Sequence, residues 1–288
     1  MKIGLIPINM GVGDIQQLVA AAQKAEAIGV ESLWTFEHVV IPVDYKSKYP
    51  YSPNGKMGVT PETYIVDPLI ALAAVAASTS KVRLATGVNI LSQTNPLYLA
   101  KQAASLDFVS SGRFMLGVGI GWLREEFDAL GVPFERRGAR FDDAIEAMRK
   151  VWSGDVVEHQ SEFLRWSGFK SYPLPIRRPG VPIIIGGSKG KAFERIARYG
   201  DGWYAPTANV GQLVELLVPL KQACAAIGRD PASVEISAMW VPAAESIDAV
   251  KRYADLGVHR LVVPTFAIGG AGVDALDRFG GEVMAKLV

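Results

Sequence analysis

The sequence is poor in cysteine and histidine, and each shortage excludes a class of protein. Cys224 is the single cysteine in 288 residues, so an internal disulfide is impossible and the chain suits a reducing compartment. The three histidines, His38, His159 and His259, form no Cys/His or His/carboxylate cluster with metal-ligand spacing, and no Ser-His-Asp set is evident. We therefore expect neither a metal site nor a serine nucleophile. His159 and His259 lie between helices and strands, and we interpret them as structural.

The sequence also lacks an excess of charge of one sign and a long hydrophobic run. It has 30 basic and 29 acidic residues, a formal net charge of +1, whereas binding of nucleic acid or an anionic membrane needs a marked positive field. The apolar stretch 69–77 is too short to span a bilayer, and the first residues show no signal-peptide pattern. We expect a cytoplasmic protein whose partner is a small molecule, with no nucleic-acid or membrane partner.

What the sequence does contain is an alternation of short β-branched runs with longer stretches of helical period. Eight of each follow one another without a Gly/Ser linker, which favours an α/β fold of the (βα)8 TIM barrel type, with insertion segments, over an open doubly wound sheet or two half-domains. The expected strands are 2–8, 32–35, 82–89, 114–117, 182–185, 202–205, 235–240 and 260–264. The expected helices are 14–28, 67–77, 95–110, 140–152, 190–199, 210–227, 247–256 and 274–287. Pro219 should kink or split the helix 210–227, because it removes a ladder hydrogen bond.

We expect one domain, 1–288, with excursions at about 36–66 and 153–181. The first excursion and the segment 118–139 follow strands, whereas 153–181 follows a helix. In a (βα)8 barrel the loops that follow strands lie at the carboxyl face, where ligands bind. The functional site is therefore expected on that face.

Two glycine turns are expected at the same face. Gly119-Ile120-Gly121-Trp122 follows the fourth strand, and Gly186-Gly187-Ser188 follows the fifth. Because glycine lets backbone N–H groups approach an anion, the two turns could hold two parts of one phosphorylated ligand. The spacing is not that of the dinucleotide fingerprint, and each turn could instead be an ordinary tight turn with positive φ. The nearby basic residues would neutralise an anionic tail or form a solvated edge; they are Arg136, Arg137, Arg140, Lys189 and Lys191.

His38 is the candidate catalytic side chain. It follows Glu37 directly after the second strand, so it should stand on the carboxyl face, where a histidine can transfer a proton near neutral pH. The alternative is a packing role in the loop. Asn89 and Ser92, at the end of the third strand, could face the same ligand, although a polar residue at a strand end is common.

From Ile3 to about Trp203 the sequence resembles the bacterial luciferase-like flavin and deazaflavin oxidoreductases, and within them the class that uses coenzyme F420. The most specific stretch is 95–114, which leads into the turn 119–122. Four shorter segments match in order: Trp34-Thr35-Phe36-Glu37-His38, Arg137-Gly138-Ala139-Arg140-Phe141, Ile185-Gly186-Gly187-Ser188 and Asp201-Gly202-Trp203. The resemblance implies the barrel already inferred, a bound F420 or alternatively FMN, and a homodimer.

The resemblance also implies where the coenzyme lies. Its ring would pack on a bulge at the end of the third strand, with a non-proline cis peptide between Asn89 and Ile90, and Ser92 would lie near the ring or the ribityl chain. The phosphate and the tail would lie on the two glycine turns. His38 matches a catalytic histidine of some deazaflavin dehydrogenases. The candidate coenzyme-binding residues are Glu37, Asn89, Ile90, Ser92, Gly119, Ile120, Gly121, Trp122, Glu125, Gly186, Gly187 and Ser188, although Glu125 and Glu126 could be helix N-terminal charges.

One departure leaves the substrate open. The deazaflavin sugar-phosphate dehydrogenases carry a catalytic acid just after the first glycine turn, where this chain has Trp122. We therefore predict hydride transfer between F420 and an unidentified organic substrate, with His38 as proton donor or ring-binding group. The alternatives are an FMN-dependent luciferase-like monooxygenase and a flavin-binding protein without turnover. A barrel isomerase or aldolase is the remaining alternative, but no suitable Lys or carboxylate pair is found at the strand ends.

Overall fold

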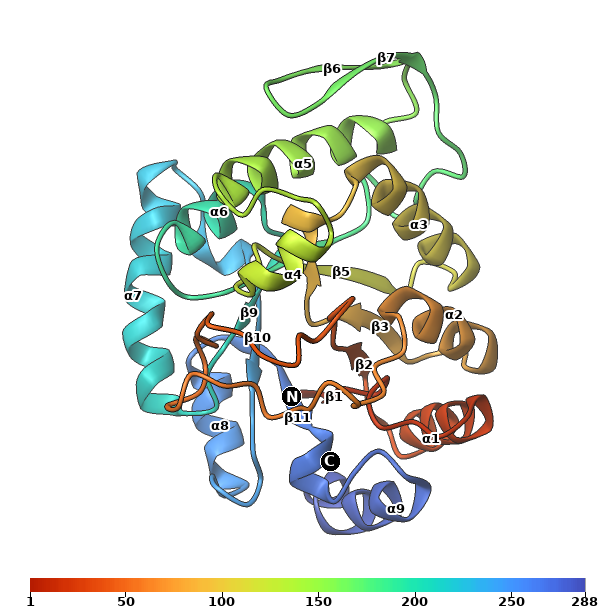
Figure 1. Cartoon of the computed structure of the whole chain (residues 1–288). Helices are drawn as coiled ribbons and strands as arrows, with labels where there is room; N and C mark the ends of the chain where they lie inside the picture. Colours follow the sequence, from red (N-terminus) through yellow and green to blue (C-terminus); the bar gives the residue numbers. More distant parts are fainter. Residues whose placement is uncertain (288) are drawn as a thin grey trace.

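The computed structural model describes residues 1–287, in which parallel strands close into a barrel inside a ring of helices (Figure 1). The sheet order is β3-β2-β1-β11-β10-β9-β8-β5, and β5 pairs with β3, which closes the barrel. The strands are β1 (Lys2–Ile6), β2 (Ser32–Thr35), β3 (Arg83–Thr86), β4 (Asn89–Ile90), β5 (Phe114–Gly119), β8 (Ile183–Gly186), β9 (Gly202–Ala205), β10 (Glu235–Met239) and β11 (Val258–Pro264). The predicted (βα)8 barrel is confirmed.

Several of the helices that cover the barrel begin at a capping side chain. The Asp67 side chain accepts from the backbone N–H groups of Leu69 and Ile70, and Asn95 does the same for the next helix, each followed by a proline at the first helical position. The helices that cover the barrel are α1 (Ile15–Ala27), α2 (Pro68–Ser78), α3 (Pro96–Val109), α5 (Arg137–Trp152), α6 (Ala192–Tyr199), α7 (Val210–Ala226), α8 (Asp248–Asp255) and α9 (Val273–Glu282). Short 3-10 turns are η1 (Leu91–Gln93), η2 (Pro231–Ser233), η3 (Thr265–Ile268) and η4 (Met284–Lys286). Within residues 1–287, no helix combines the length and the apolar character that crossing a bilayer requires.

Two predicted details are wrong. The third strand is interrupted: β3 ends at Thr86 and β4 resumes at Asn89, because pairing with β5 is re-established only where Asn89 lies opposite Val118. Of the kink or split predicted at Pro219, the split is wrong, because helix α7 continues to Ala226, and the kink stays a prediction. Buried Leu217 and Leu220 flank the proline on the core side, and their packing keeps the helix continuous despite the lost hydrogen bond.

The interior of the barrel is filled by side chains. Trp34 and Tyr204 lie at its centre with ring centroids 5.2 Å apart. At the amino-terminal end of the strands, the fully buried Arg260 guanidinium donates two hydrogen bonds to Glu31, at 2.6 and 2.8 Å, and also pairs with Glu235. The interior cluster comprises Ile6, Trp34, Ala85, Met115, Ile184, Tyr204 and Val262.

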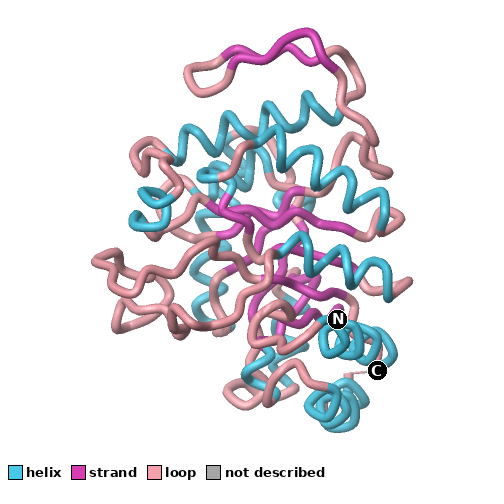
Figure 2. The backbone as a smooth tube through the Cα atoms, turned by 45° about the vertical axis from the view of Figure 1, so that its right-hand side comes forward, coloured by secondary structure: helices cyan, strands magenta, loops and turns pink. Residues whose placement is uncertain are grey.

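Two excursions leave the regular βα units (Figure 2). The segment 36–66 is held at both ends by Asn9, whose side chain accepts from Phe36 N–H and donates to the carbonyl oxygens of Phe36 and Val66. The segment 153–181 forms an antiparallel hairpin outside the barrel, next to α5, from β6 (Val157–Gln160) and β7 (Arg165–Phe169). A short helix that the sequence did not predict, α4 (Arg124–Ala129), follows β5.

Candidate active site

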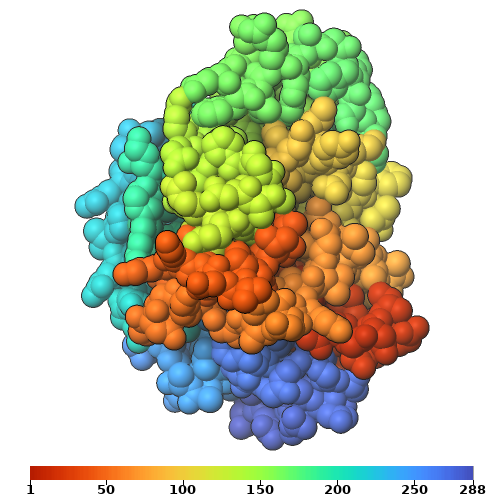
Figure 3. All heavy atoms as spheres, viewed as in Figure 1, coloured from red at the N-terminus to blue at the C-terminus, as the bar shows by residue number. Residues whose placement is uncertain are grey.

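The mouth of the barrel, at the carboxyl ends of the strands, is covered by two neighbouring segments. Figure 3 shows the loop 36–66 lying against the segment that contains α4. Backbone N–H groups of the loop donate to α4 carboxylates: Val39 to Glu126 at 2.6 Å and Lys46 to Glu125 at 2.7 Å. The two covering segments are therefore fixed to each other by charge-assisted hydrogen bonds.

A buried histidine–carboxylate pair lies beneath this cover. His38 Nδ1 is 2.9 Å from Glu126 Oε2, and both side chains are only 2% exposed. Glu126 also accepts from Val39 N–H, an arrangement that suits an ionised carboxylate. Because a carboxylate oxygen can only accept, Nδ1 of His38 donates this hydrogen bond, and Nε2 remains for a ligand. The pair has the geometry of an acid–base group held in one orientation.

Trp122 forms the centre of an aromatic wall over the mouth. Its ring makes edge contacts with His38, Tyr45 and Tyr49 at centroid distances of 6.0, 5.7 and 5.1 Å. Burial, with Tyr51 adding to it, raises the pKa of Tyr49 to about 12. Tyr49 therefore stays a neutral hydrogen-bonding group across the physiological pH range.

Glu37 supports the bulge between β3 and β4. Its Oε2 accepts from the backbone N–H of Ile90 at 2.6 Å, and its side chain is buried. Burial is the largest effect on this carboxyl group, and Glu126 and Asp67 add repulsion, so its pKa rises to about 8. Glu37 is therefore uncharged at neutral pH.

The two glycine turns meet at the side chain of Val88, which stands on the bulge. A methyl group added at Gly119 would lie 2.8 Å from one Val88 methyl, and one added at Gly186 would lie 3.0 Å from the other. The absence of a side chain at Gly119 and Gly186 therefore lets both strands approach Val88 closely. Gly121 and Gly187 have φ of 74° and 113°, so the interpretation as tight turns also holds at these two positions.

The basic residues near the first turn bind backbone oxygens. Arg137 Nε donates to the carbonyl oxygen of Gly121 at 3.1 Å, and Arg140 Nε donates to that of Ser92 at 3.0 Å. The Ser92 hydroxyl in turn donates to the carbonyl oxygen of Arg137 at 3.0 Å. Ser92 and the two arginines thus connect the end of β4 to the start of α5. Lys189, beyond the second turn, is exposed.

The structure brings most of the predicted site residues together and separates a few. Glu37, His38, Ile90 and Trp122 lie at the mouth, next to the turns Gly119–Gly121 and Gly186–Ser188. The Glu125 side chain is directed to the loop, where hydrogen bonds from Ser47 and Lys46 outweigh burial and hold its pKa at about 2. The Asn89 side chain lines a pocket outside the mouth.

The predicted position of the cis peptide is wrong. The bond lies between Gly87 and Val88, two residues before the expected Asn89–Ile90 bond. Asn89 and Ile90 are already back in register with Val118 and Gly119, so the irregular backbone ends before them.

Three residues at the mouth were not predicted. Glu126 is the partner of His38, Tyr49 packs on Trp122, and Tyr204 lies on the barrel floor with a buried hydroxyl that has no hydrogen-bond partner within residues 1–287. Glu126 had a detectable signal, because Leu123 and Phe127 flank it on the buried side of a short helix. Nothing in the local sequence around Tyr49 or Tyr204 indicates a position at the mouth.

Comparison with known proteins places this arrangement in a family. The model of the luciferase-like monooxygenase family matches residues 6–271. An uncharacterized protein of Mycobacterium tuberculosis is 34% identical over 271 residues, which cover 93% of each chain. The two sequences thus align over most of the length of each chain.

Relatives with a described activity use either of two coenzymes. The F420-dependent hydroxymycolic acid dehydrogenase of Mycobacterium tuberculosis is 29% identical over 262 residues, 87% of this chain and 67% of that protein. The FMNH(2)-dependent dimethylsulfone monooxygenase of Pseudomonas putida is 26% identical over 213 residues, 73% of this chain and 55% of that protein. The solved structure of an F420-dependent secondary alcohol dehydrogenase has the same fold, with a TM-score of 0.76, 16% identity and coverage of 99% and 98% of the two chains.

Proposed function

The chain belongs to the luciferase-like monooxygenase family, whose members include F420-dependent and FMN-dependent oxidoreductases, and from this membership we propose that it is an F420-dependent oxidoreductase. It would transfer a hydride between the deazaflavin and an organic substrate at the barrel mouth. The observation that carries the proposal is the buried His38–Glu126 pair. Interconversion of an alcohol and a carbonyl moves a proton together with the hydride, and such a pair supplies the group that exchanges the proton.

The residues at the mouth fit a tricyclic coenzyme. Val88 offers an apolar surface between the glycine turns. A side chain at Gly119 or Gly186 would crowd this surface. The Tyr204 hydroxyl below is buried and has no partner among residues 1–287, so it can hydrogen-bond a polar ring edge. Backbone N–H groups of the turns, with Ser188 and the nearby Lys189, would hold the phosphate and the tail. When bound, the coenzyme supplies or accepts the hydride.

The protein residues then have separate tasks. Glu126 keeps the proton of His38 on Nδ1, so that Nε2 exchanges a proton with the substrate oxygen. Trp122, Tyr45 and Tyr49 wall the mouth and exclude water from the reacting atoms. Glu37 holds the bulge in place through Ile90 N–H.

Titration of the purified protein with oxidised F420 and with FMN tests the coenzyme assignment. Because Trp122 lies at the mouth, we expect F420 to quench tryptophan fluorescence with a dissociation constant on the order of 1 µM, at least about tenfold below that of FMN. The Trp122→Phe variant should lose much of the quenching, whereas Trp166→Phe, on the outer hairpin, should keep it. Tighter binding of FMN, or binding of neither coenzyme, would contradict the assignment.

A further inference from the structure

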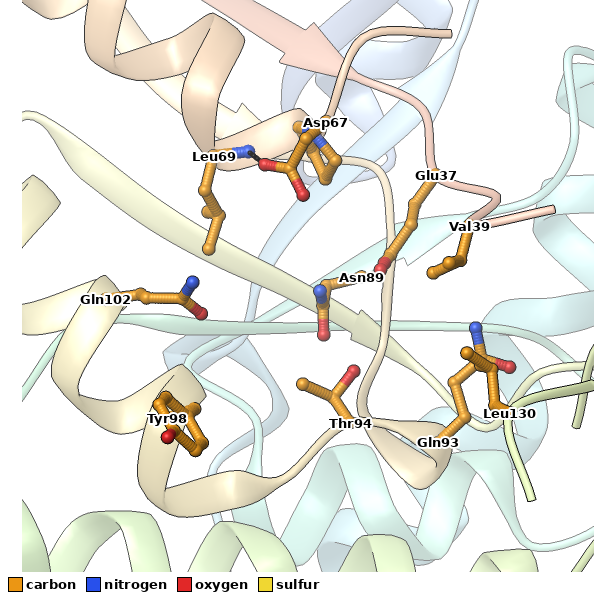
Figure 4. A pocket seen from close by; sticks show the side chains of 11 residues that line it. Glu37, Val39, Asp67, Leu69, Asn89, Gln93, Thr94, Tyr98, Gln102 and Leu130 are labelled. Atoms are coloured by element: carbon orange, nitrogen blue, oxygen red, sulfur yellow. Dashed lines mark hydrogen bonds between the residues drawn. The ribbon is translucent and has the colours of Figure 1, made fainter. Parts of the chain in front are cut away.

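A second pocket lies outside the barrel mouth, between the amino-terminal ends of α2 and α3 (Figure 4). Val88 and Ile90 contact the glycine turns of the mouth, and Asn89 between them points the opposite way, as alternation along a strand requires. The pocket has a volume of about 300 Å³. Its polar side chains come from the loop after β2, from the α2 cap, from β4 and η1, and from α3: Glu37, Asp67, Asn89, Gln93, Thr94 and Gln102.

The pocket contains buried polar atoms that lack a partner. Gln93 is 8% exposed, yet neither its Nε2 nor its Oε1 has a hydrogen-bond partner among residues 1–287. Asn89 is 3% exposed, and its Oδ1 is also unpaired there. In Figure 4 the ends of Asn89, Glu37 and Gln102 point into the same space. Buried amides are nearly always hydrogen-bonded, so these atoms indicate that the pocket is built to hold a polar molecule.

The charges of the side chains that line the pocket indicate which class of ligand it binds. Within the described residues the lining includes two carboxyl groups, Glu37 and Asp67, and no Lys, Arg or His. Asp67 Oδ1 caps α2 by accepting from Leu69 and Ile70 N–H, so its second oxygen remains to accept from a ligand. The side chains of the lining therefore bring carboxyl groups and no cation, and an anionic ligand is disfavoured.

We propose that this pocket binds a small organic cation of the guanidinium class. A planar cation with several N–H donors matches the carboxylate of Asp67 and the amide oxygens of Asn89 and Gln93, and carboxylates accept such groups in pairs. The Tyr98 ring at the edge of the pocket can stack on the plane of the ligand. A volume of about 300 Å³ equals that of roughly ten water molecules, enough for a short alkylguanidine. The pocket shares Glu37 with the bulge of the proposed coenzyme site but lies on the other side of β4, and its occupation requires no coenzyme.

Titration of the full chain with methylguanidinium, followed by two-dimensional amide NMR, tests the proposal. We expect saturable shifts of the Leu69, Ile90 and Gln93 amides with a dissociation constant on the order of 1 mM. Urea, a neutral molecule of similar shape, and acetate, an anion, should bind at least about tenfold more weakly. Absence of shifts at these amides, which would leave the pocket to water alone, or equal binding of urea, would overturn the proposal.

Two variants test the residues of the pocket. Gln93→Leu and Asp67→Asn should each weaken methylguanidinium binding about tenfold, since each removes a hydrogen-bonding or charged partner. Asparagine can still cap α2, so Asp67→Asn keeps the fold. Gln160→Leu, the same change on the exposed outer hairpin, should leave binding unaltered. Gln93→Leu should also leave F420 titration unaltered, which separates this proposal from the coenzyme assignment. Unweakened binding in both pocket variants would overturn it.

The pH dependence supplies an independent test. The charged or titratable groups around Glu37 are Asp67 and Glu126, with His38 beyond Glu126. Because the pKa of Glu37 is raised to about 8, a cation should bind about tenfold more tightly at pH 9 than at pH 7, as the carboxyl loses its proton. The Glu37→Gln variant should abolish this difference. A pH-independent affinity of the unaltered protein would contradict the role of Glu37 in the pocket.

Discussion

Replacement of His38 with alanine is expected to lower kcat by roughly 10²–10⁴-fold, the range found for loss of a positioned general acid or base. The imidazole is the titratable group that pairs with the buried Glu126 carboxylate at the mouth, 2.9 Å away. Without it, the proton that accompanies hydride transfer must come from water, which Trp122 and Tyr49 partly exclude. The measurement is steady-state kinetics with F420, together with coenzyme titration of the same variant.

Two carboxylate variants distinguish catalysis from loop anchoring. Glu126→Gln should also lower kcat, because the glutamine no longer fixes the His38 proton on Nδ1. The loss should be smaller than that in His38→Ala. Glu125→Gln is the matched control: the neighbouring carboxylate anchors the same loop through Lys46 N–H but does not contact His38. An unchanged kcat in His38→Ala, or an equal loss in Glu125→Gln, would remove the proposed proton role.

Replacement of Arg260 with methionine is expected to lower the free energy of unfolding by about 3–5 kcal/mol. The guanidinium is fully buried at the amino-terminal end of the barrel, where it binds Glu31 through two hydrogen bonds and also pairs with Glu235. Methionine fills a similar space but leaves Glu31 and Glu235 close together with only more distant cations, since Arg83 Nη1 lies 3.9 Å from each of them. Urea-induced unfolding followed by circular dichroism measures the loss.

The matched control for Arg260 is an arginine in an exposed ion pair. Arg198 pairs with Glu146, and its side chain is 66% exposed, so Arg198→Met should change the free energy of unfolding by less than about 1 kcal/mol. A double variant, Arg260→Met with Glu31→Leu, should recover part of the loss because it removes one of the two carboxylates that lose Arg260. If Arg260→Met were as stable as the control, the buried network would have no stabilising role.

The architecture could be predicted because the local sequence of each βα unit indicates its strand and its helix. Runs such as Ser32–Thr35 and Gly202–Ala205 are short, apolar and bounded by turn residues, and both strands were predicted to the residue. A bulge at the end of the third strand was expected from the family resemblance, but its position directly after Thr86 was not, since apolar character continues through the interruption and only pairing with β5 places it. Helix α4 and the β6–β7 hairpin were missed because each is too short to show a period.

The site residues, like the elements of the fold, divide into those that could be predicted from the sequence and those that could not. His38 and the glycine turns were predicted because they directly follow strands, and strand ends gather at one face of a barrel. The partner of His38, Glu126, lies 88 residues further along the chain, so only the folded barrel reveals the pair. The pocket between α2 and α3 likewise exists only once the two helices are packed. The homodimer, the substrate and the individual coenzyme contacts stay predictions.

The most direct test of the central claim follows the hydride itself. The protein is supplied with reduced F420 that carries two deuterium atoms at C5 and with a panel of ketones and aldehydes in ordinary water. Oxygen is excluded, and the products are analysed by mass spectrometry. Hydride transfer predicts an alcohol that carries one deuterium on carbon per coenzyme oxidised. A parallel reaction receives oxygen and reduced FMN instead. Absence of the deuterated alcohol in the first reaction, with addition of an oxygen atom to the substrate in the second, would contradict the account.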